Sequence, residues 1–314
     1  MEDSTLKAKQ TSVRRFLRDV RTGSAPFGYL LIGPLVLWLV LTIVVPLVYA
    51  FYVSFTDAGI IGTGAEFIGL ENYTKMLGDG EFRSAFGRSI IWAIGGAVVQ
   101  TVLAFATALA LNQAFRGRRF ARTWIILSWI IPTIVVAILW RWMLNASYGI
   151  VNFLVTTLGI SDAPIDFLGS VKWALPTVIM INAWRWFPFL ALLILAGLQS
   201  IPGELYEAAR VDGANATQRF FAITMPQLQP VLYVVGLIGT LWAVNIFDVI
   251  WLLTQGGPSG ATQTLPVLIY DRAFNGFALG EASAISVLLC VFLLIFSVLY
   301  IRFVPAGESD TEVF

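Results

Sequence analysis

Six apolar segments, each long enough to cross a lipid bilayer, constrain this chain more than any other feature of its sequence. A membrane-spanning helix needs about 20 mainly apolar residues. The segments cover residues 27–53, 85–112, 121–144, 173–199, 228–253 and 280–304. They have almost none of the polar faces that a large soluble helical protein would need. The sequence therefore predicts an all-α integral membrane protein with six transmembrane helices.

The distribution of basic residues predicts how these segments are oriented. Thirteen of the 20 basic residues lie on one side of the predicted membrane. They occupy the N-terminal tail, the loops after the second and fourth segments, and the exit of the last segment. Because basic loops stay in the cytoplasm, we expect both termini there. The expected organisation is a basic cytoplasmic tail over residues 1–26, a six-span domain over 27–304 and a cytoplasmic C-terminal tail over 305–314.

Missing residue types exclude several classes of function. The chain has no His, and its single cysteine, Cys290, lies in an apolar segment, so disulfides within the chain and Cys/His metal sites are excluded. The lysines at positions 7, 9, 75 and 172 are not in a phosphate-binding loop, so any ATP-driven step needs a partner. A net charge of +1 gives no indication of nucleic-acid binding. We expect a non-enzymatic chain with no catalytic residue, metal site or cofactor of its own.

The loop between the fourth and fifth segments, residues 200–227, carries the most specific pattern. It reads Glu207-Ala208-Ala209-Arg210-Val211-Asp212-Gly213, followed by Ile223-Thr224-Met225-Pro226. Pro202 suits the first turn of a short helix, with Ser200 or Ile201 near its cap, and Gly213 should end that helix. A second short helix is expected at about 217–224. A short amphipathic helix on a loop is suited to a groove in a partner protein.

This pattern, E-A-A-x3-G-x9-I-x-L-P, resembles the coupling loop of permease subunits in binding-protein-dependent ABC importers. Met225 departs from it where leucine is usual, a swap that conserves volume. The resemblance implies the type I importer fold, with a cytoplasmic coupling helix between spans four and five. It also implies that this chain docks onto an ATPase through Glu207, Ala208, Ala209, Asp212 and Gly213.

Other segments resemble the sugar-importing permeases of the maltose and glycerol-phosphate type. These are residues 67–73, 184–189, 195–202 and 253–258, with single matches that include Pro132, Trp140, Gly149 and Asn152. The resemblance implies a heterodimer with a second homologous permease, in a bacterial or archaeal cytoplasmic membrane. It further implies an ATPase dimer that binds ATP and Mg, and an extracytoplasmic solute-binding protein that delivers the sugar. Transport would proceed by alternating access.

Polar and aromatic residues deep in two segments are candidates for the substrate path. They are Asn182, Arg185 and Trp186 in the fourth segment and Trp242, Asn245 and Asp248 in the fifth. Asn245 and Asp248 are three residues apart, so we expect them on one helical face, with Trp242 a turn earlier. The resemblance places Asn245 most clearly at the sugar site. Arg185 and Asp248 are open to two interpretations, substrate contact or a structural ion pair.

Three classes of transporter have several apolar spans: a sugar-importer permease, a permease for another small solute, and an ion channel or secondary transporter. A permease for another small solute would share the coupling loop but lack the Trp184-Arg185 and Gly256-Gly257-Pro258 segments. An ion channel or secondary transporter does not explain the coupling loop. The sequence therefore favours a sugar-importer permease and leaves the sugar unidentified. The alternative is a permease for glycerol phosphate or an anionic sugar derivative, which could use Arg185.

Overall fold

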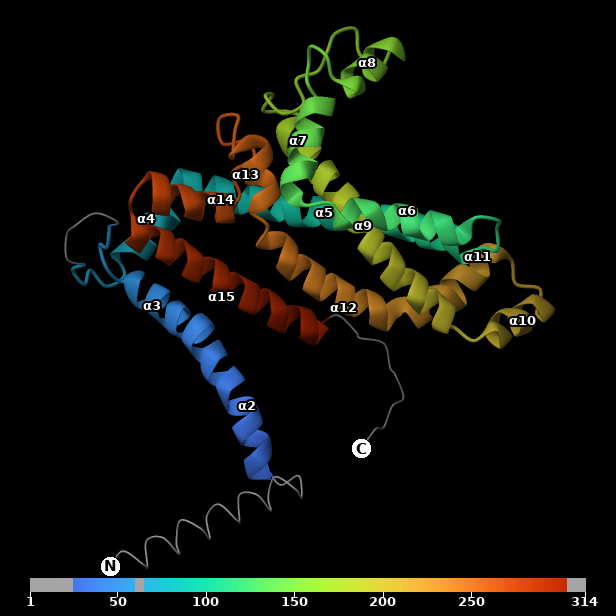
Figure 1. Ribbon diagram of the computed structural model, residues 1–314, viewed down its shortest axis with the longest axis horizontal. Coiled ribbons are helices and arrows are strands. Elements are labelled where there is room, and N and C mark those ends of the chain that lie inside the picture. Colours follow the sequence, from blue (N-terminus) through green and yellow to red (C-terminus); the bar gives the residue numbers. More distant parts are fainter. Residues whose placement is uncertain (1–24, 60–64, 304–314) are drawn as a thin grey trace, which may run out of the picture.

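The computed structural model describes residues 25–59 and 65–303, which are helical apart from loops and two isolated β-bridges. Most of the predicted N-terminal tail (residues 1–24) and the predicted C-terminal tail lie outside the described residues. The long helices α5 (Gly80–Asn112), α9 (Ala174–Ser200), α12 (Met225–Val244) and α15 (Leu279–Phe303) run roughly along one direction (Figure 1). The fold is therefore all-α, as the apolar segments predicted.

Ten shorter helices complete the described part of the chain. They are α2 (Ala25–Leu39), α3 (Val45–Val53), α4 (Glu71–Gly78), α6 (Arg118–Ile130), α7 (Thr133–Met143), α8 (Ile150–Thr157), α10 (Gly203–Val211), α11 (Ala216–Arg219), α13 (Asp248–Thr254) and α14 (Leu265–Tyr270). Turns of wider π-helix cover Val40–Val44, Phe220–Thr224 and Asp271–Asn275. Within the described residues, five helices are long and apolar enough to cross a membrane: Leu31–Val53, Gly80–Asn112, Ala174–Ser200, Ala216–Val244 and Leu279–Phe303.

The third predicted span is a bent pair of helices, which counts as one span only if both parts cross the membrane together. α6 and α7 meet at an angle of 95°. Pro132 lacks a backbone N–H and disfavours helical dihedrals in the residue before it. Ile131 accordingly adopts an extended conformation, with φ −62° and ψ 129°. The chain turns a corner where the apolar pattern alone indicated a continuous helix.

The fifth predicted span is also divided. α12 ends at Val244, and α13 starts at Asp248 after a short break. At the break, the side chain of Asn245 donates to the carbonyl of Leu241 at 2.8 Å. The buried indole of Trp92 donates to the carbonyl of Ala243 at 2.9 Å. These two bonds satisfy helix-end carbonyls that a continuous helix would have used, so the break is stable within the apolar body.

The packed centre of the molecule is the contact between α5 and α9. Small residues on α5, such as Ala104 and Ala108, are fully buried and allow α9 to approach with Ile194 and Leu195. The first helix is different, because α2 and α3 extend away from this centre (Figure 1). Their apolar side chains are exposed almost throughout the span. The described chain therefore has a packed body and an uncovered first helix.

Two buried asparagines fix the loops on the side of the body opposite to α10. The side chain of Asn72, in α4, donates to the carbonyls of Ser54 and Thr56 at 3.0 and 2.8 Å. Asn152, in α8, donates to the carbonyl of Ile165 at 3.0 Å and accepts from its N–H at 2.7 Å. Both belong to segments that resemble sugar-importing permeases. In this chain their direct contacts are with loop backbone, so they organise structure.

Candidate functional site

The α10 loop ends in a well-defined backbone turn. Gly213 has φ +79°, in the left-handed region that favours glycine. Its N–H bonds the carbonyl of Arg210 at 3.1 Å, and the N–H of Ala214 bonds that of Ala209 at 2.8 Å. This pair of bonds is the Schellman motif that closes a helix C-terminus. The predicted end of the short helix at Asp212-Gly213 is confirmed.

Two details of the loop differ from the sequence prediction. Pro202 occupies the N-cap of α10, so Ser200 remains the last residue of α9 and the cap is not at Ser200 or Ile201. The expected second short helix is not separate. It is the beginning of one helical stretch, Ala216–Val244, which consists of α11, the π-helical residues Phe220–Thr224 and α12. A capping box between Asn215 and Gln218 starts it. The sequence suggests a separate helix because Pro226 follows it. In the structure, Phe220–Thr224 form a π-helical turn that continues directly into α12.

α10 presents an uncovered surface. None of its residues is buried, and Glu207, Ala208, Asp212 and Gly213 are exposed while Ala209 is half-buried. Val211, an apolar residue, is 89% exposed. A hydrogen bond of 2.9 Å between the hydroxyls of Tyr206 and Thr224 holds α10 against the residues that lead into α12. The loop is thus fixed on one side and open on the other.

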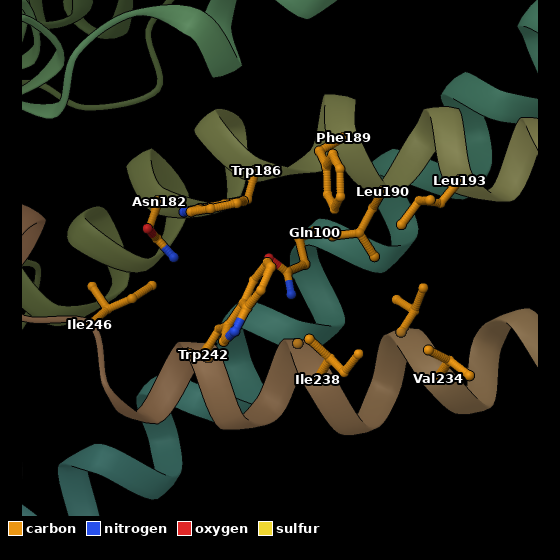
Figure 2. A pocket seen from close by; sticks show the side chains of 13 residues that line it. Gln100, Asn182, Trp186, Phe189, Leu190, Leu193, Val234, Ile238, Trp242 and Ile246 are labelled. Atoms are coloured by element: carbon orange, nitrogen blue, oxygen red, sulfur yellow. The ribbon is translucent and has the colours of Figure 1, made fainter. Parts of the chain in front are cut away.

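A cavity of about 190 Å³ lies between α5, α9 and α12. Figure 2 shows Asn182 and Trp186 from α9, Trp242 from α12 and Gln100 from α5 around the same space. The remaining lining is apolar: Phe189, Leu190, Leu193, Val234, Val235, Ile238, Gly239, Ala243 and Ile246. Three of the six predicted substrate-path residues therefore line one cavity. They are Asn182, Trp186 and Trp242.

The cavity contains polar groups without partners in the described chain. The side-chain oxygen of Asn182 and the indole N–H of Trp186 are both buried and make no hydrogen bond. The rings of Trp186 and Trp242 have centroids 6.1 Å apart and are tilted by 50°. None of the lining side chains is ionisable. The lining therefore presents two aromatic surfaces to a neutral polar ligand, and a rotation of Asn182 or Trp186 toward the cavity would add an acceptor or a donor.

Arg185 and Asp248 do not line this cavity. They face each other, with Nη1 of Arg185 at 3.7 Å from Oδ2 of Asp248. The Arg185 side chain is 15% exposed and that of Asp248 is 52% exposed. The Arg185 guanidinium also lies 5.6 Å from the ring centre of Trp186. The pair links α9 to the first turn of α13, next to the cavity wall.

Asn245 lies apart from the residues with which it was grouped. It is exposed at the end of α12, and the helix break separates it from Asp248, so the prediction of one helical face was wrong. Gln100 lines the cavity and was not predicted. It is a single amide within the apolar run Val98-Val99-Gln100-Thr101-Val102. The criterion that selected Asn182, polarity at depth, would also have selected Gln100.

Comparison with known proteins assigns the family. Residues 100–305 match the model of a family described as binding-protein-dependent transport system inner membrane component. The chain belongs to this family. The matched region contains both the α10 loop and the cavity.

Curated relatives are similar over nearly the whole chain. The chain is 37% identical over 281 residues to the trehalose/maltose transport system permease protein MalF of Thermococcus litoralis, covering 88% of this chain and 93% of the relative. It is 31% identical over 308 residues to the sulfoquinovosyl glycerol transport system permease protein SmoG of Agrobacterium fabrum, covering 98% and 99%. This inner membrane component therefore has permease relatives of its own length.

A solved structure shares the fold. It is the bacterial alginate ABC transporter in complex with an alginate pentasaccharide-bound periplasmic protein. One of its chains aligns with a TM-score of 0.79 and 22% identity, covering 94% of this chain and 99% of that one. The fold of this family member is that of a type I ABC importer permease.

Proposed function

We propose that this inner membrane component forms half of the translocation path for a sugar. The observation that carries the proposal is the cavity between α5, α9 and α12, whose uncharged lining combines the amides of Gln100 and Asn182 with the indole rings of Trp186 and Trp242. Sugar hydroxyls both donate and accept hydrogen bonds, and sugar ring faces pack on aromatic rings. The trehalose/maltose and sulfoquinovosyl glycerol permeases, whose names include sugars, support the same class.

The cavity favours an uncharged sugar over the alternative substrates, glycerol phosphate or an anionic sugar derivative. An anion held inside an apolar site needs a cation or several hydrogen bonds. Arg185 is the nearest candidate cation, but Asp248 already faces its guanidinium and neither residue lines the cavity. An anionic substrate would therefore have to compete with Asp248 for Arg185 or bring Arg185 into the cavity lining.

The open side of α10 is the proposed docking surface for an ATPase subunit. Glu207, Ala208, Asp212 and Gly213 are exposed, and the small alanine side chain allows close approach of another chain. The charged residues would set the orientation of the contact, and exposed Val211 would be buried in it. Tyr206 would transmit the motion, because its hydrogen bond joins α10 to the helix that ends at the cavity.

The proposed assembly contains a second homologous permease, an ATPase dimer that binds ATP and Mg, and an extracytoplasmic solute-binding protein. The family description supports the binding protein, and the alginate transporter was solved with a periplasmic one. Both termini and α10 would lie in the cytoplasm, as the basic loops predict. ATP binding and hydrolysis in the partner would bias the permease pair between outward-open and inward-open states.

Reconstitution of the complex tests this function. The chain, tagged, is co-expressed with the proteins encoded beside it, and ATP hydrolysis is measured in proteoliposomes with a panel of sugars and glycerol phosphate. We expect hydrolysis and uptake that depend on the binding protein and an uncharged sugar, and no hydrolysis by the chain alone. Robust hydrolysis by the isolated chain would contradict the proposal. Stimulation by glycerol phosphate in place of sugars would move the site to the alternative class.

A further inference from the structure

A pair of arginines converges on one neutral side chain at the end of the body that carries α10. Arg118 and Arg122 lie one turn apart in α6, and both reach Gln199 in the last turn of α9. With the Gln199 amide oriented by these partners, its oxygen accepts from Nη2 of Arg118 at 2.5 Å and of Arg122 at 2.7 Å. The Nε atoms of both arginines are buried and have no hydrogen-bond partner. Two cations thus share one uncharged acceptor.

No counter-charge accompanies this pair within residues 25–59 and 65–303. The ion pairs found there involve Lys75, Arg185 and Arg272, and none involves Arg118 or Arg122. The first turn of α6 contains no acidic residue and no side-chain cap. The positive end of the helix dipole therefore adds to the charge of the guanidiniums. Two partly buried like charges at such an end are stable when an anion binds between them.

The opposite face of α6 indicates where in the membrane the pair lies. Phe120 and Trp124 stack with centroids 5.8 Å apart, and they are 70% and 64% exposed. Exposed tryptophan on an apolar helix is typical of the boundary between lipid tails and headgroups. Arg118 is six residues before Trp124, about 9 Å further toward the water at 1.5 Å per residue. Arg122 is only two residues before Trp124, about 3 Å, and its long side chain can extend toward the water to the level of Arg118. The guanidiniums would therefore lie near the depth of lipid phosphates.

We propose that Arg118 and Arg122, positioned by Gln199, bind the phosphate of an anionic phospholipid such as phosphatidylglycerol. Guanidinium groups match phosphate oxygens through paired hydrogen bonds, and only one Nη of each arginine bonds Gln199. Basic pockets between transmembrane helices on the cytoplasmic side are suited to such headgroups. The binding site is at the end of α9, three residues before Pro202 and the start of α10. Lipid composition would thereby affect the joint that carries α10.

Native mass spectrometry of the full chain in neutral detergent tests this site. Phosphatidylglycerol or phosphatidylcholine is titrated onto the wild type and onto the double variant R118Q/R122Q. We expect tighter binding of phosphatidylglycerol by the wild type. In the variant we expect a loss of about tenfold or more, as removal of charge-assisted hydrogen bonds predicts. The variant R118K/R122K retains the charge but lacks the paired donors, so it should bind phosphatidylglycerol with intermediate affinity. It replaces R118Q/R122Q as the test variant if that protein does not accumulate.

The matched control is R116Q/R119Q, which removes the same charge from two exposed arginines beside the pair, one in the loop before α6 and one in its first turn, neither of which contacts Gln199. We expect a smaller loss in this control. Equal losses in both double variants, or unchanged binding in R118Q/R122Q, would overturn the site. Displacement of the lipid by an equal concentration of inorganic phosphate would also overturn it. If R118Q/R122Q retains phosphatidylglycerol but no longer holds an ATPase subunit, the pair is a protein contact and the lipid proposal fails.

Discussion

At the scale of single residues, the cavity is defined by hydrogen-bonding atoms that the chain itself leaves unused. Burying such an atom without a partner costs about 1–3 kcal/mol. The oxygen of Asn182 and the indole N–H of Trp186 are in this condition on one face of α9. A rotation of either side chain toward the cavity would let a ligand supply the missing partner and offset that cost. The unpartnered atoms therefore favour occupation by a hydroxyl-rich molecule.

Asn182→Ala should weaken transport because it removes the acceptor from the cavity. Loss of one or two hydrogen bonds to the sugar corresponds to about tenfold or more in uptake at limiting substrate. The complex should still assemble, and its hydrolysis of ATP without substrate should persist. Uptake and yield are measured together in proteoliposomes.

Asn245→Ala is the matched control for that change. Asn245 is exposed, and its side chain bonds only the carbonyl of Leu241 among the described residues. We expect its replacement to have a small effect on uptake. A normal rate in Asn182→Ala together with a strong loss in Asn245→Ala would return the site to the position that the sequence first suggested.

Only part of the cavity lining could be predicted from the sequence, because the spacing of residues along a helix loses its meaning where the helix ends. Asn182 and Trp186 were found because polarity and aromatic bulk at mid-span are visible in a one-dimensional pattern. Asn245 and Asp248 were grouped by helical spacing, which fails where the helix ends. That end depends on Trp92, 151 positions away in the sequence, and no local pattern contains such a contact.

At the scale of elements, the contact between Arg185 and Asp248 adds a charged link between α9 and α13, two helices that also share a core through Val249, Ile250 and Leu253. α13 starts at Asp248 and is attached to the body partly through this pair. The two partners are not equivalent, because Arg185 is much more buried than Asp248. An unpaired charge costs more in the less exposed position.

Single changes to this pair should therefore have unequal effects on stability. Asp248→Asn leaves the guanidinium of Arg185 without its partner and should lower the free energy of unfolding by about 1–3 kcal/mol. Arg185→Met leaves a carboxylate that water can reach and should cost less. The double variant should recover part of the loss in thermal unfolding of the purified complex. Equal and additive losses would show that the two side chains do not interact.

The elements themselves were largely predictable. Length and apolarity predicted four spans to within about five residues, because a bilayer requires both. The fifth was displaced, since its helix runs over Ala216–Val244 and not over 228–253. The corner between α6 and α7 was missed although Pro132 was visible, since apolarity is the same in a straight and a bent segment. The end of α10 was predicted correctly because Gly213 specifies a backbone conformation by itself.

At the scale of the whole molecule, the exposed α10 and the cavity are connected by one continuous helix from Ala216 to Val244. Its first residues lie beside α10, and its last residues contribute Trp242 and Ala243 to the cavity. A force on α10 is therefore delivered to the cavity wall along a rigid element. Docking and substrate access are linked by this geometry.

Glu207→Lys should prevent ATPase docking at α10 without changing the cavity. Reversing an exposed charge at the proposed docking surface should weaken ATPase association and abolish uptake, while the binding protein keeps its affinity for sugar. Glu66→Lys is the control, because it reverses an exposed charge in the loop between α3 and α4, at the opposite end of the molecule. Co-purified ATPase and uptake are measured at equal membrane abundance. Wild-type uptake in Glu207→Lys would refute the docking role.

The first helix, α2 with α3, can insert into the bilayer before the rest of the chain has packed. Because α2 and α3 bury little surface within the chain, their transfer into the bilayer does not depend on the packing of later helices. α5 and α9, in contrast, reach their final form only against each other. Since the N-terminal helix is synthesised before them, it can act as a tether in the lipid while the body is still incomplete. Biogenesis thus starts with an anchor whose stability is independent of the core, and the core assembles later beside it.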